Sequence, residues 1–258
     1  MKKYNTVVWV MAMIALSLVY GNAQTISTNQ WEPHGFVSVK AYDHYQSSRL
    51  GSSLTRTPVI WSEAEFLLPK GFYINSFGSY SISEAPDQKM GNQIDLVLGK
   101  RWKLSDLKEL KLDFGVRYSN VAPLGEWING DLVYINLVIS RDFVLSPHHT
   151  IRPSIYSEWM SCIDAYDRGA LIEKLGFTHI WKAPFGIKSL SFVSCNFFSY
   201  AGQFGKMQEG VFFWSDVSFN WRVTPKLELV LPGCRFIKDM DGTREDNKSL
   251  MAGARLTF

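Results

Sequence analysis

The chain has little charge, little cysteine and few long apolar runs. Only 20% of its 258 residues are charged, 27 basic against 24 acidic, so it lacks the strongly basic face of a nucleic-acid-binding protein. A mean hydropathy of −0.06 excludes a bundle of transmembrane helices, because each helix needs about 20 mostly apolar residues. Three cysteines, Cys162, Cys195 and Cys234, are too few for a disulfide framework. One bridge at most is possible, with Cys195 and Cys234 as the candidate pair, and small space-filling side chains are the alternative.

Motifs that bind metals or phosphates are also missing. The chain has no pair of histidines or cysteines at the spacing typical of a zinc site, and no glycine-rich phosphate loop. We therefore expect no metal site and no cofactor. What the chain has in quantity is hydrophobic residues, at 46%, and aromatic residues, at 14%. This composition excludes an intrinsically disordered protein, which has few aromatics and more charge.

Residues 1–23 have the pattern of a secretory signal peptide. Two lysines precede an uncharged apolar run over residues 7–20, and small residues stand just before Gln24. The run is 14 residues long, shorter than the roughly 18 that a transmembrane anchor needs. We expect cleavage before Gln24 and a periplasmic lead-in over residues 24–34.

After this segment the dominant hydrophobic period is two residues. The end of the chain shows it most clearly, because one face of residues 250–258 is wholly apolar and the other carries Arg255. Such alternation over about ten residues is typical of a strand with one apolar and one polar face. Pro232 indicates a bulge within one of these strands. The pattern predicts twelve strands, at 35–44, 59–68, 72–82, 92–102, 111–121, 130–142, 150–159, 170–181, 187–200, 211–222, 227–237 and 248–258.

Strand length separates two all-β folds. Strands of a soluble β-sandwich average five or six residues, whereas about ten residues are needed to cross a bilayer at a tilt near 45°. Tight turns alternate with longer connections along the chain, none of them above roughly 13 residues, as in outer-membrane barrels. We therefore predict one antiparallel transmembrane β-barrel over residues 35–258, with about twelve strands and both termini in the periplasm.

The last strand resembles the assembly signal of bacterial outer-membrane β-barrels. Phe258 ends the chain, and Leu256 and Ala254 precede it at alternate positions. The resemblance implies a porin-like barrel in the outer membrane of a Gram-negative bacterium, surrounded by its lipids and inserted by the barrel-assembly machinery. It does not identify a specific family.

Aromatic residues near the strand ends predict two girdles at the membrane surfaces. Those expected at the turn side are Trp102, Phe143, Trp181, Trp221 and Phe258. Those expected at the loop side are Trp127, Trp159 and Tyr200.

Charged residues opposite the apolar faces must point into the lumen, because charge is costly on the lipid side. The predicted pore-lining set at mid-height is Lys40, Glu63, Glu65, Asp95, Arg117, Lys174 and Asp216. Lys40 is expected to face Glu63 or Glu65, and Asp95 to face Arg117. Two interpretations remain open: the charges line a water-filled passage, or they pair into a network that plugs a narrow lumen. Four acids against three bases predict weak selectivity, slightly for cations.

The leading functional prediction is a porin-like channel for passive diffusion of small polar solutes. The alternative is a structural or adhesive barrel that binds a partner through its surface loops. An outer-membrane lipid hydrolase is the third interpretation. It would use His44 with Ser47 or Ser48, since a serine nucleophile needs a nearby base, but we predict no catalytic residues and no enzyme.

Overall fold

A computed structural model describes residues 34–82, 92–104, 109–121, 131–163, 169–204 and 209–258. The expected signal peptide, nearly all of the lead-in, and Trp127 lie outside these ranges. Within them, no helix has both the length and the apolar character needed to cross a membrane.

Strands make up nearly all of the regular structure, and their bounds agree with the alternation of the sequence to within about three residues. They are β1 (His34–Tyr42), β2 (Gln46–Ser47), β3 (Ser52–Ser53), β4 (Val59–Leu67), β5 (Phe72–Ser81), β6 (Gln93–Leu104), β7 (Leu110–Val121), β8 (Leu132–Ser140), β9 (Phe143–Val144), β10 (His149–Cys162), β11 (Gly169–Lys182), β12 (Leu190–Ala201), β13 (Gly210–Arg222), β14 (Leu227–Asp239) and β15 (Asn247–Thr257).

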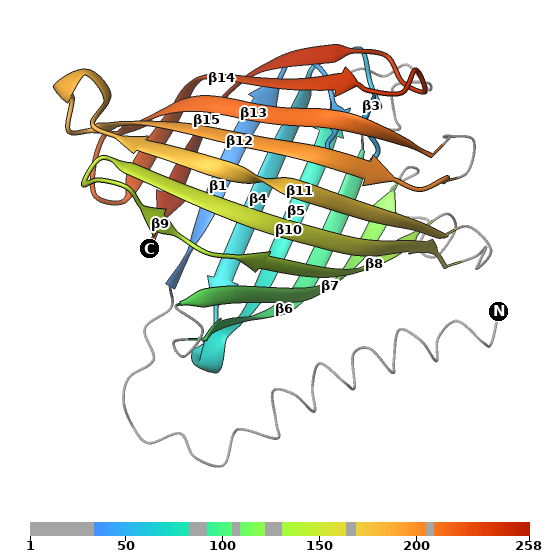
Figure 1. Ribbon diagram of the computed structural model, residues 1–258, viewed down its shortest axis with the longest axis horizontal. Coiled ribbons are helices and arrows are strands. Elements are labelled where there is room, and N and C mark those ends of the chain that lie inside the picture. Colours follow the sequence, from blue (N-terminus) through green and yellow to red (C-terminus); the bar gives the residue numbers. More distant parts are fainter. Residues whose placement is uncertain (1–33, 83–91, 105–108, 122–130, 164–168, 205–208) are drawn as a thin grey trace. The chain divides into compact units, whose positions relative to one another are not determined.

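The long strands close into an antiparallel barrel. Neighbours in sequence pair with one another, β1 pairs with β15, and β10 pairs with both β8 and β11, so the ring has no free edge. In Figure 1 the strands β10 to β14, yellow to red, cross in front of β1, β4 and β5, blue to cyan. With β8 and β9 counted as one broken strand, the wall has the predicted twelve strands. A closed ring satisfies every backbone hydrogen bond of a strand that crosses lipid.

The break between β8 and β9 differs from the single strand expected at 130–142. Both pieces pair with β10, where Ser140 lies opposite Ser154 and Phe143 lies opposite Ile151. Pro153 of β10 stands in the gap. Because proline has no backbone N–H, the ladder loses a donor there and the regular pairing is interrupted.

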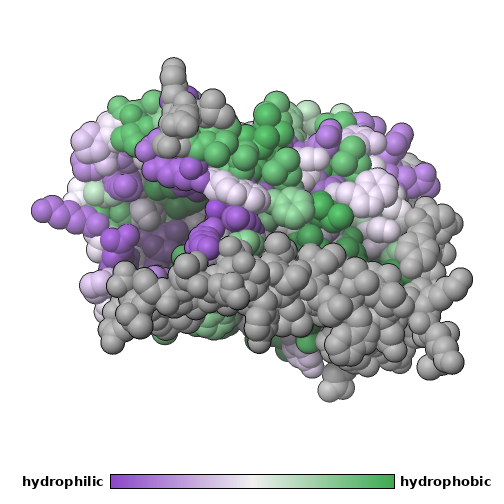
Figure 2. All heavy atoms as spheres, turned by 90° about the horizontal axis from the view of Figure 1, so that it is seen from below, coloured by the Kyte–Doolittle hydropathy of each residue, from purple (hydrophilic) through white to green (hydrophobic). Residues whose placement is uncertain are grey.

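Side chains alternate between the two faces of the wall. On β1, Val37 and Val39 are exposed on the outer face, whereas Ser38 and Tyr42 are buried on the inner face. Figure 2 shows hydrophobic side chains, in green, over much of the visible outer wall, with hydrophilic side chains gathered toward its ends. Where the sequence predicts an apolar face, as on β1, that face is the outer face of the barrel.

The two ends of the barrel differ in their connections. One end has tight turns, two of which are 3-10 turns at Pro69–Gly71 and Pro184–Gly186. The other end has longer connections, of which residues 43–58 are the longest fully described. The aromatic side chains Trp102 and Trp221 are exposed near the turn end, in agreement with a girdle at that level.

The structure tests two predictions about β14, the bulge at Pro232 and the disulfide bridge between Cys195 and Cys234. The expected bulge is confirmed, because one extra residue of β14 falls between Val230 and Gly233. The candidate bridge between Cys195 and Cys234 is wrong, because all three cysteines are free. Cys195 lies opposite Asp216 and faces the lumen, whereas Cys234 lies opposite Val217 and faces outward.

Candidate functional site

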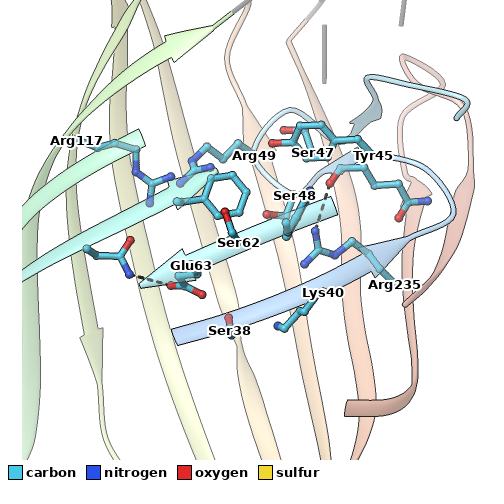
Figure 3. Close-up of a pocket in the computed structure, with 14 residues that line it drawn as sticks. Ser38, Lys40, Tyr45, Ser47, Ser48, Arg49, Ser62, Glu63, Arg117 and Arg235 are labelled. Atoms are coloured by element: carbon cyan, nitrogen blue, oxygen red, sulfur yellow. Dashed lines mark hydrogen bonds between the residues drawn. The ribbon is translucent and has the colours of Figure 1, made fainter. Parts of the chain in front are cut away.

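Residues 43–58, which join β1 to β4, fold into the barrel instead of extending away from it. We call them the inner segment. Tyr45 and Thr55 are buried, at 5% and 3% exposure. Figure 3 shows Tyr45, Ser47, Ser48 and Arg49 of the inner segment within the barrel, above the strands that carry Lys40 and Glu63. The longest fully described connection therefore occupies the lumen.

The inner segment is a small hairpin held by its own backbone. β2 and β3 pair within it, Leu54 N–H donates to the Tyr45 carbonyl at 2.8 Å, and Gly51 N–H donates to the Ser47 carbonyl at 2.9 Å. Gly51 has φ +66°, and a Cβ there would approach the Phe212 ring at 2.6 Å. Glycine meets both demands, because it has no Cβ and adopts positive φ at no steric cost.

Four contacts tie the inner segment to strands and connections around the wall. Arg49 Nε donates to Glu158 Oε1 on β10 at 2.8 Å, and Tyr45 Oη donates to Gln93 on β6 at 3.1 Å. Arg235 of β14 donates to the Gln46 carbonyl at 3.3 Å. Arg244, between β14 and β15, donates to the Leu50 carbonyl at 2.8 Å. Burial raises the pKa of the Tyr45 phenol to about 12, so this side chain remains a neutral donor.

Apolar side chains cluster at the loop end of the lumen, next to the inner segment. Leu50 packs against this cluster, which keeps the segment anchored by burial of apolar surface. The buried members come from six strands, β8 and β10 to β14: Leu132, Tyr134, Met160, Cys162, Ala170, Ile172, Ala201, Phe212 and Ile237.

A cavity of about 270 Å³ lies beside the inner segment. Its charged lining residues are Lys40, Arg49, Glu63, Arg117 and Arg235. Its uncharged lining includes serines and aromatic rings. Arg49 and Arg117 lie over the same ring, that of Tyr134, with guanidinium carbons 5.2 and 5.8 Å from its centroid. The inner segment and the wall thus bring separate positive groups to one space.

Ion pairs hold most of the inward charges. The expected pair of Asp95 and Arg117 forms, with Arg117 Nη1 at 3.1 Å from Asp95 Oδ2. Asp216, another member of the predicted set, accepts from Arg235 Nη2 at 2.7 Å. Both acids are buried or nearly so. Charge-assisted hydrogen bonds of this kind compensate for the cost of taking the groups out of water.

The expected contact of Lys40 with Glu63 or Glu65 is wrong. Lys40 lies opposite Trp61 in the register of β1 and β4, and Ser38 lies opposite Glu63. Glu65 instead binds Arg101 through two hydrogen bonds of 2.8 Å, and Glu63 accepts from Asn75 at 2.9 Å. The offset of Lys40 from Glu63 is two positions, the same as that of Asp95 from Arg117, so register alone does not decide the pairing. Here the neighbouring Asn75 donates to the carboxylate instead.

Lys174, the last of the predicted set, has an aromatic environment. Its Nζ lies 5.0 Å from the centroid of the Tyr156 ring and 5.3 Å from that of Trp214, distances typical of cation–π contacts. The side chain is 9% exposed. It therefore sits in the packed part of the lumen and not on the cavity.

The mid-height set omits Arg101, Arg235 and Arg49, which bind acids of the lumen. Arg101 has the same strand parity as Asp95, so alternation alone could have placed it inside. Arg235 follows the bulge of β14, which reverses the parity of the strand. Arg49 lies in a connection, where period-two alternation carries no information about direction.

Within the described residues, His44 forms no hydrogen bond to Ser47 or Ser48 that would activate a serine nucleophile. Its Nδ1 lies 2.9 Å from Asp43 Oδ1 and its Nε2 lies 2.7 Å from Asn247 Oδ1. The Ser47 hydroxyl accepts from Leu50 N–H instead. Among all residues that the structure describes, no group of three or more His, Cys, Asp or Glu side chains is placed to hold a metal ion.

Comparison with known proteins identifies the fold. No protein-family model and no curated protein matches the sequence at a significant level. Solved structures do match. An outer-membrane channel from Pseudomonas putida F1 superposes with a TM-score of 0.58 at 11% identity, over 91% of this chain and 100% of the other. The NanC porin gives 0.54 at 9% identity, over 86% and 100% of the two chains. The KdgM porin gives 0.50 at 8%, over 87% and 99%. The chain therefore has the fold of small outer-membrane β-barrel channels.

Proposed function

We propose that this chain is a porin-like channel through which small hydrophilic solutes diffuse across the outer membrane of a Gram-negative bacterium. The observation that carries the proposal is the cavity inside a closed, outwardly apolar wall, lined by Lys40, Glu63 and Arg117 from the wall itself. Charged side chains in contact with a cavity favour a wet lumen, because water solvates them at little cost. The inner segment narrows this lumen and limits the size of solute that passes.

The predicted orientation is part of the proposal. Outer-membrane barrels have short turns on the periplasmic side and longer loops outside. This rule places Pro69–Gly71 and Pro184–Gly186 in the periplasm, together with both termini. Delivery by the signal peptide of residues 1–23 and insertion by the barrel-assembly machinery complete the pathway that the terminal Phe258 indicates.

The conformation of the inner segment favours a channel over the adhesive alternative. An adhesive barrel presents long loops to its partner, whereas the longest fully described connection here is turned inward and held by Arg49, Arg235 and Arg244. A segment fixed in the lumen is suited to control passage. It offers little surface to a macromolecule outside.

Conductance of the refolded, mature protein in a planar bilayer tests the proposal. We expect discrete conductance steps, and swelling of proteoliposomes in small neutral sugars, neither of which occurs with heat-unfolded protein. A protein that migrates as a folded barrel yet gives neither steps nor swelling would overturn the proposed channel.

A further inference from the structure

The charges on the lumen cavity are unequal. We propose that this cavity selects small hydroxylated organic anions, a proposal that rests on the channel function and names its solute class. Four cationic side chains line the cavity, Lys40, Arg49, Arg117 and Arg235, against the single carboxylate of Glu63. Figure 3 shows them arriving from β1, the inner segment and other parts of the wall.

The acids that pair with these arginines do not line the cavity. Asp95, Glu158 and Asp216 bind Arg117, Arg49 and Arg235 respectively, and none of the three is among the lining residues. Each guanidinium has five N–H donors in a planar fork, so an acid behind it leaves other donors directed elsewhere. The pairs therefore hold the arginines in place while the face toward the cavity stays cationic.

Several buried donors around the cavity have no hydrogen-bond partner within the described part of the chain. They are the Nε of Arg117, the Nε of Arg235 and the Nε1 of Trp61. The Arg235 side chain is only 8% exposed. Buried donors are nearly always satisfied by an acceptor, and a carboxylate offers two oxygens that match an arginine fork. Among the residues that line the cavity, the unmet groups are all donors, the type of group that binds an anion.

Lys40 contributes the least restrained charge. Among the residues that the structure describes, its ammonium group forms no ion pair, and it lies on the inner face of β1, opposite Trp61. An ammonium group without a fixed partner attracts a passing anion without first breaking a contact. Lys40 is thus the residue whose replacement should change selectivity with the least effect on folding.

The remaining lining favours an organic anion over an inorganic one. The rings of Tyr45, Trp61 and Phe77 form one aromatic side of the cavity, with Trp61 edge-on to the other two at centroid distances of 5.2 and 5.1 Å. Hydroxyl groups of Ser38 and Ser47 are also present. Apolar rings contact carbon–hydrogen faces, and serines hydrogen-bond hydroxyl groups. The volume of about 270 Å³ lies just below the range of drug-sized pockets, about 300–1,000 Å³.

This polarity differs from the slight cation preference expected from the sequence. The sequence-based balance counted Glu65, Asp95 and Asp216 as free acids and omitted Arg49 and Arg235. In the structure those three acids are bound to arginines, and the two omitted arginines line the cavity.

Three six-carbon probes of similar size test the inference: gluconate, sorbitol and protonated glucosamine. Proteoliposomes containing the wild-type protein should take up gluconate several-fold faster than sorbitol, and glucosamine most slowly. Reversal potentials under a potassium gluconate gradient should report the same preference. Lys40→Glu should reduce the gluconate-to-sorbitol ratio several-fold, whereas Lys226→Glu, in an exposed turn, should leave it unchanged.

The outcomes separate the two proposals. Equal uptake of all three probes, or preference for glucosamine, would overturn anion selection while the channel function stands. No uptake of any probe by folded protein would overturn the channel function itself. A ratio unaffected by Lys40→Glu in a variant that keeps the heat-modifiable mobility of a folded barrel would remove the cavity as the selective element.

Discussion

Arg49 binds Glu158 across the width of the lumen. The Nε atom of Arg49 donates to Oε1 of Glu158 at 2.8 Å, and Glu158 is only 1% exposed. Arg49 belongs to the inner segment that follows β1, and Glu158 lies on β10, six strands from β1 in either direction around the ring. This one ion pair therefore joins the inner segment to the opposite side of the barrel.

Removing Arg49 should destabilise the protein strongly. Arg49→Met leaves the Glu158 carboxylate buried without its partner, and we expect a loss of about 3–5 kcal/mol in the free energy of unfolding. The double variant Arg49→Met with Glu158→Leu should recover most of that loss. Urea unfolding in lipid vesicles, followed by tryptophan fluorescence, measures it.

An exposed ion pair serves as the control for that experiment. Lys238 and Asp246 are 63% and 52% exposed, so Lys238→Met should cost no more than about 1 kcal/mol. Equal losses for Arg49→Met and Lys238→Met would contradict the role of the cross-lumen pair.

Substitution of Gly51 should widen the passage. Gly51→Ala places a Cβ against the Phe212 ring and forces alanine to φ +66°, so the inner segment should shift from its position and single-channel conductance should rise. Gly242 is a matched control, since its φ is +79° but a Cβ there meets nothing within 4 Å. If the alanine variants at positions 51 and 242 have the same conductance, the contact of position 51 with Phe212 has no effect on the pore. That result would contradict a restriction of the pore by the inner segment.

Two acids of the predicted pore-lining set should behave differently when neutralised. Glu63→Gln removes a cavity charge that forms no ion pair within the described residues and accepts a hydrogen bond from the neutral Asn75. Selectivity should therefore move further toward anions with little change in stability. Asp95→Asn leaves Arg117 without its carboxylate and should also lower stability by a few kcal/mol. Reversal potentials measure the ion selectivity of both variants, and unfolding curves measure their stability. Large stability losses with unchanged potentials in both would indicate a plugged lumen.

Deleting Phe258 should impair assembly. Its backbone N–H and carbonyl both bond to Gly35, at 3.1 Å each, and its ring lies 5.6 Å from that of Phe66. The deletion weakens the pairing of β15 with β1. It also removes the terminal residue of the segment that resembles an outer-membrane assembly signal. Deletion of Thr25, in the expected lead-in, is the control, and similar yields of folded protein in the outer membrane from both deletions would count against the prediction.

Processing of the chain is testable by protein sequencing. Cleavage after Ala23 should give a mature protein that begins at Gln24, because small residues precede that bond. Edman degradation or mass spectrometry of outer-membrane material gives the answer. Recovery of residues 1–20 in an inner-membrane fraction would disprove the signal peptide.

Most of the barrel could be predicted because the lipid around it requires apolar side chains on the outer face of the wall, and this produces a regular alternation along the strands. Every strand that crosses lipid must place apolar residues outside, so a period of two marks most strands, although it leaves the facing of those at 170–181, 187–200 and 227–237 ambiguous. The prediction was also less exact where the backbone departs from that period. Pro153 divides β8 from β9, and the bulge near Pro232 exchanges the two faces of β14.

The lumen could be predicted only in part, since its contacts depend on register and on a connection. The pair of Asp95 and Arg117 is predictable because both residues lie on the inner face of neighbouring strands, only two positions apart in the register. Arg49 is not, because the direction of residues 43–58 is set by tertiary contacts such as Leu50 with the apolar cluster. No local pattern distinguishes a connection that folds inward from one that extends outward.

The seam between β1 and β15 constrains the order in which the molecule is made. Asp43 N–H donates to the Leu250 carbonyl, and Leu250 N–H donates to the Asp43 carboxylate, although the two residues are 207 positions apart. Such distant contacts form late and slow the folding of a chain. Until they form, β1 and β15 are unpaired edges that cannot lie in lipid. The inner segment begins at this seam, so we expect closure of the wall and placement of the inner segment to be coupled during folding.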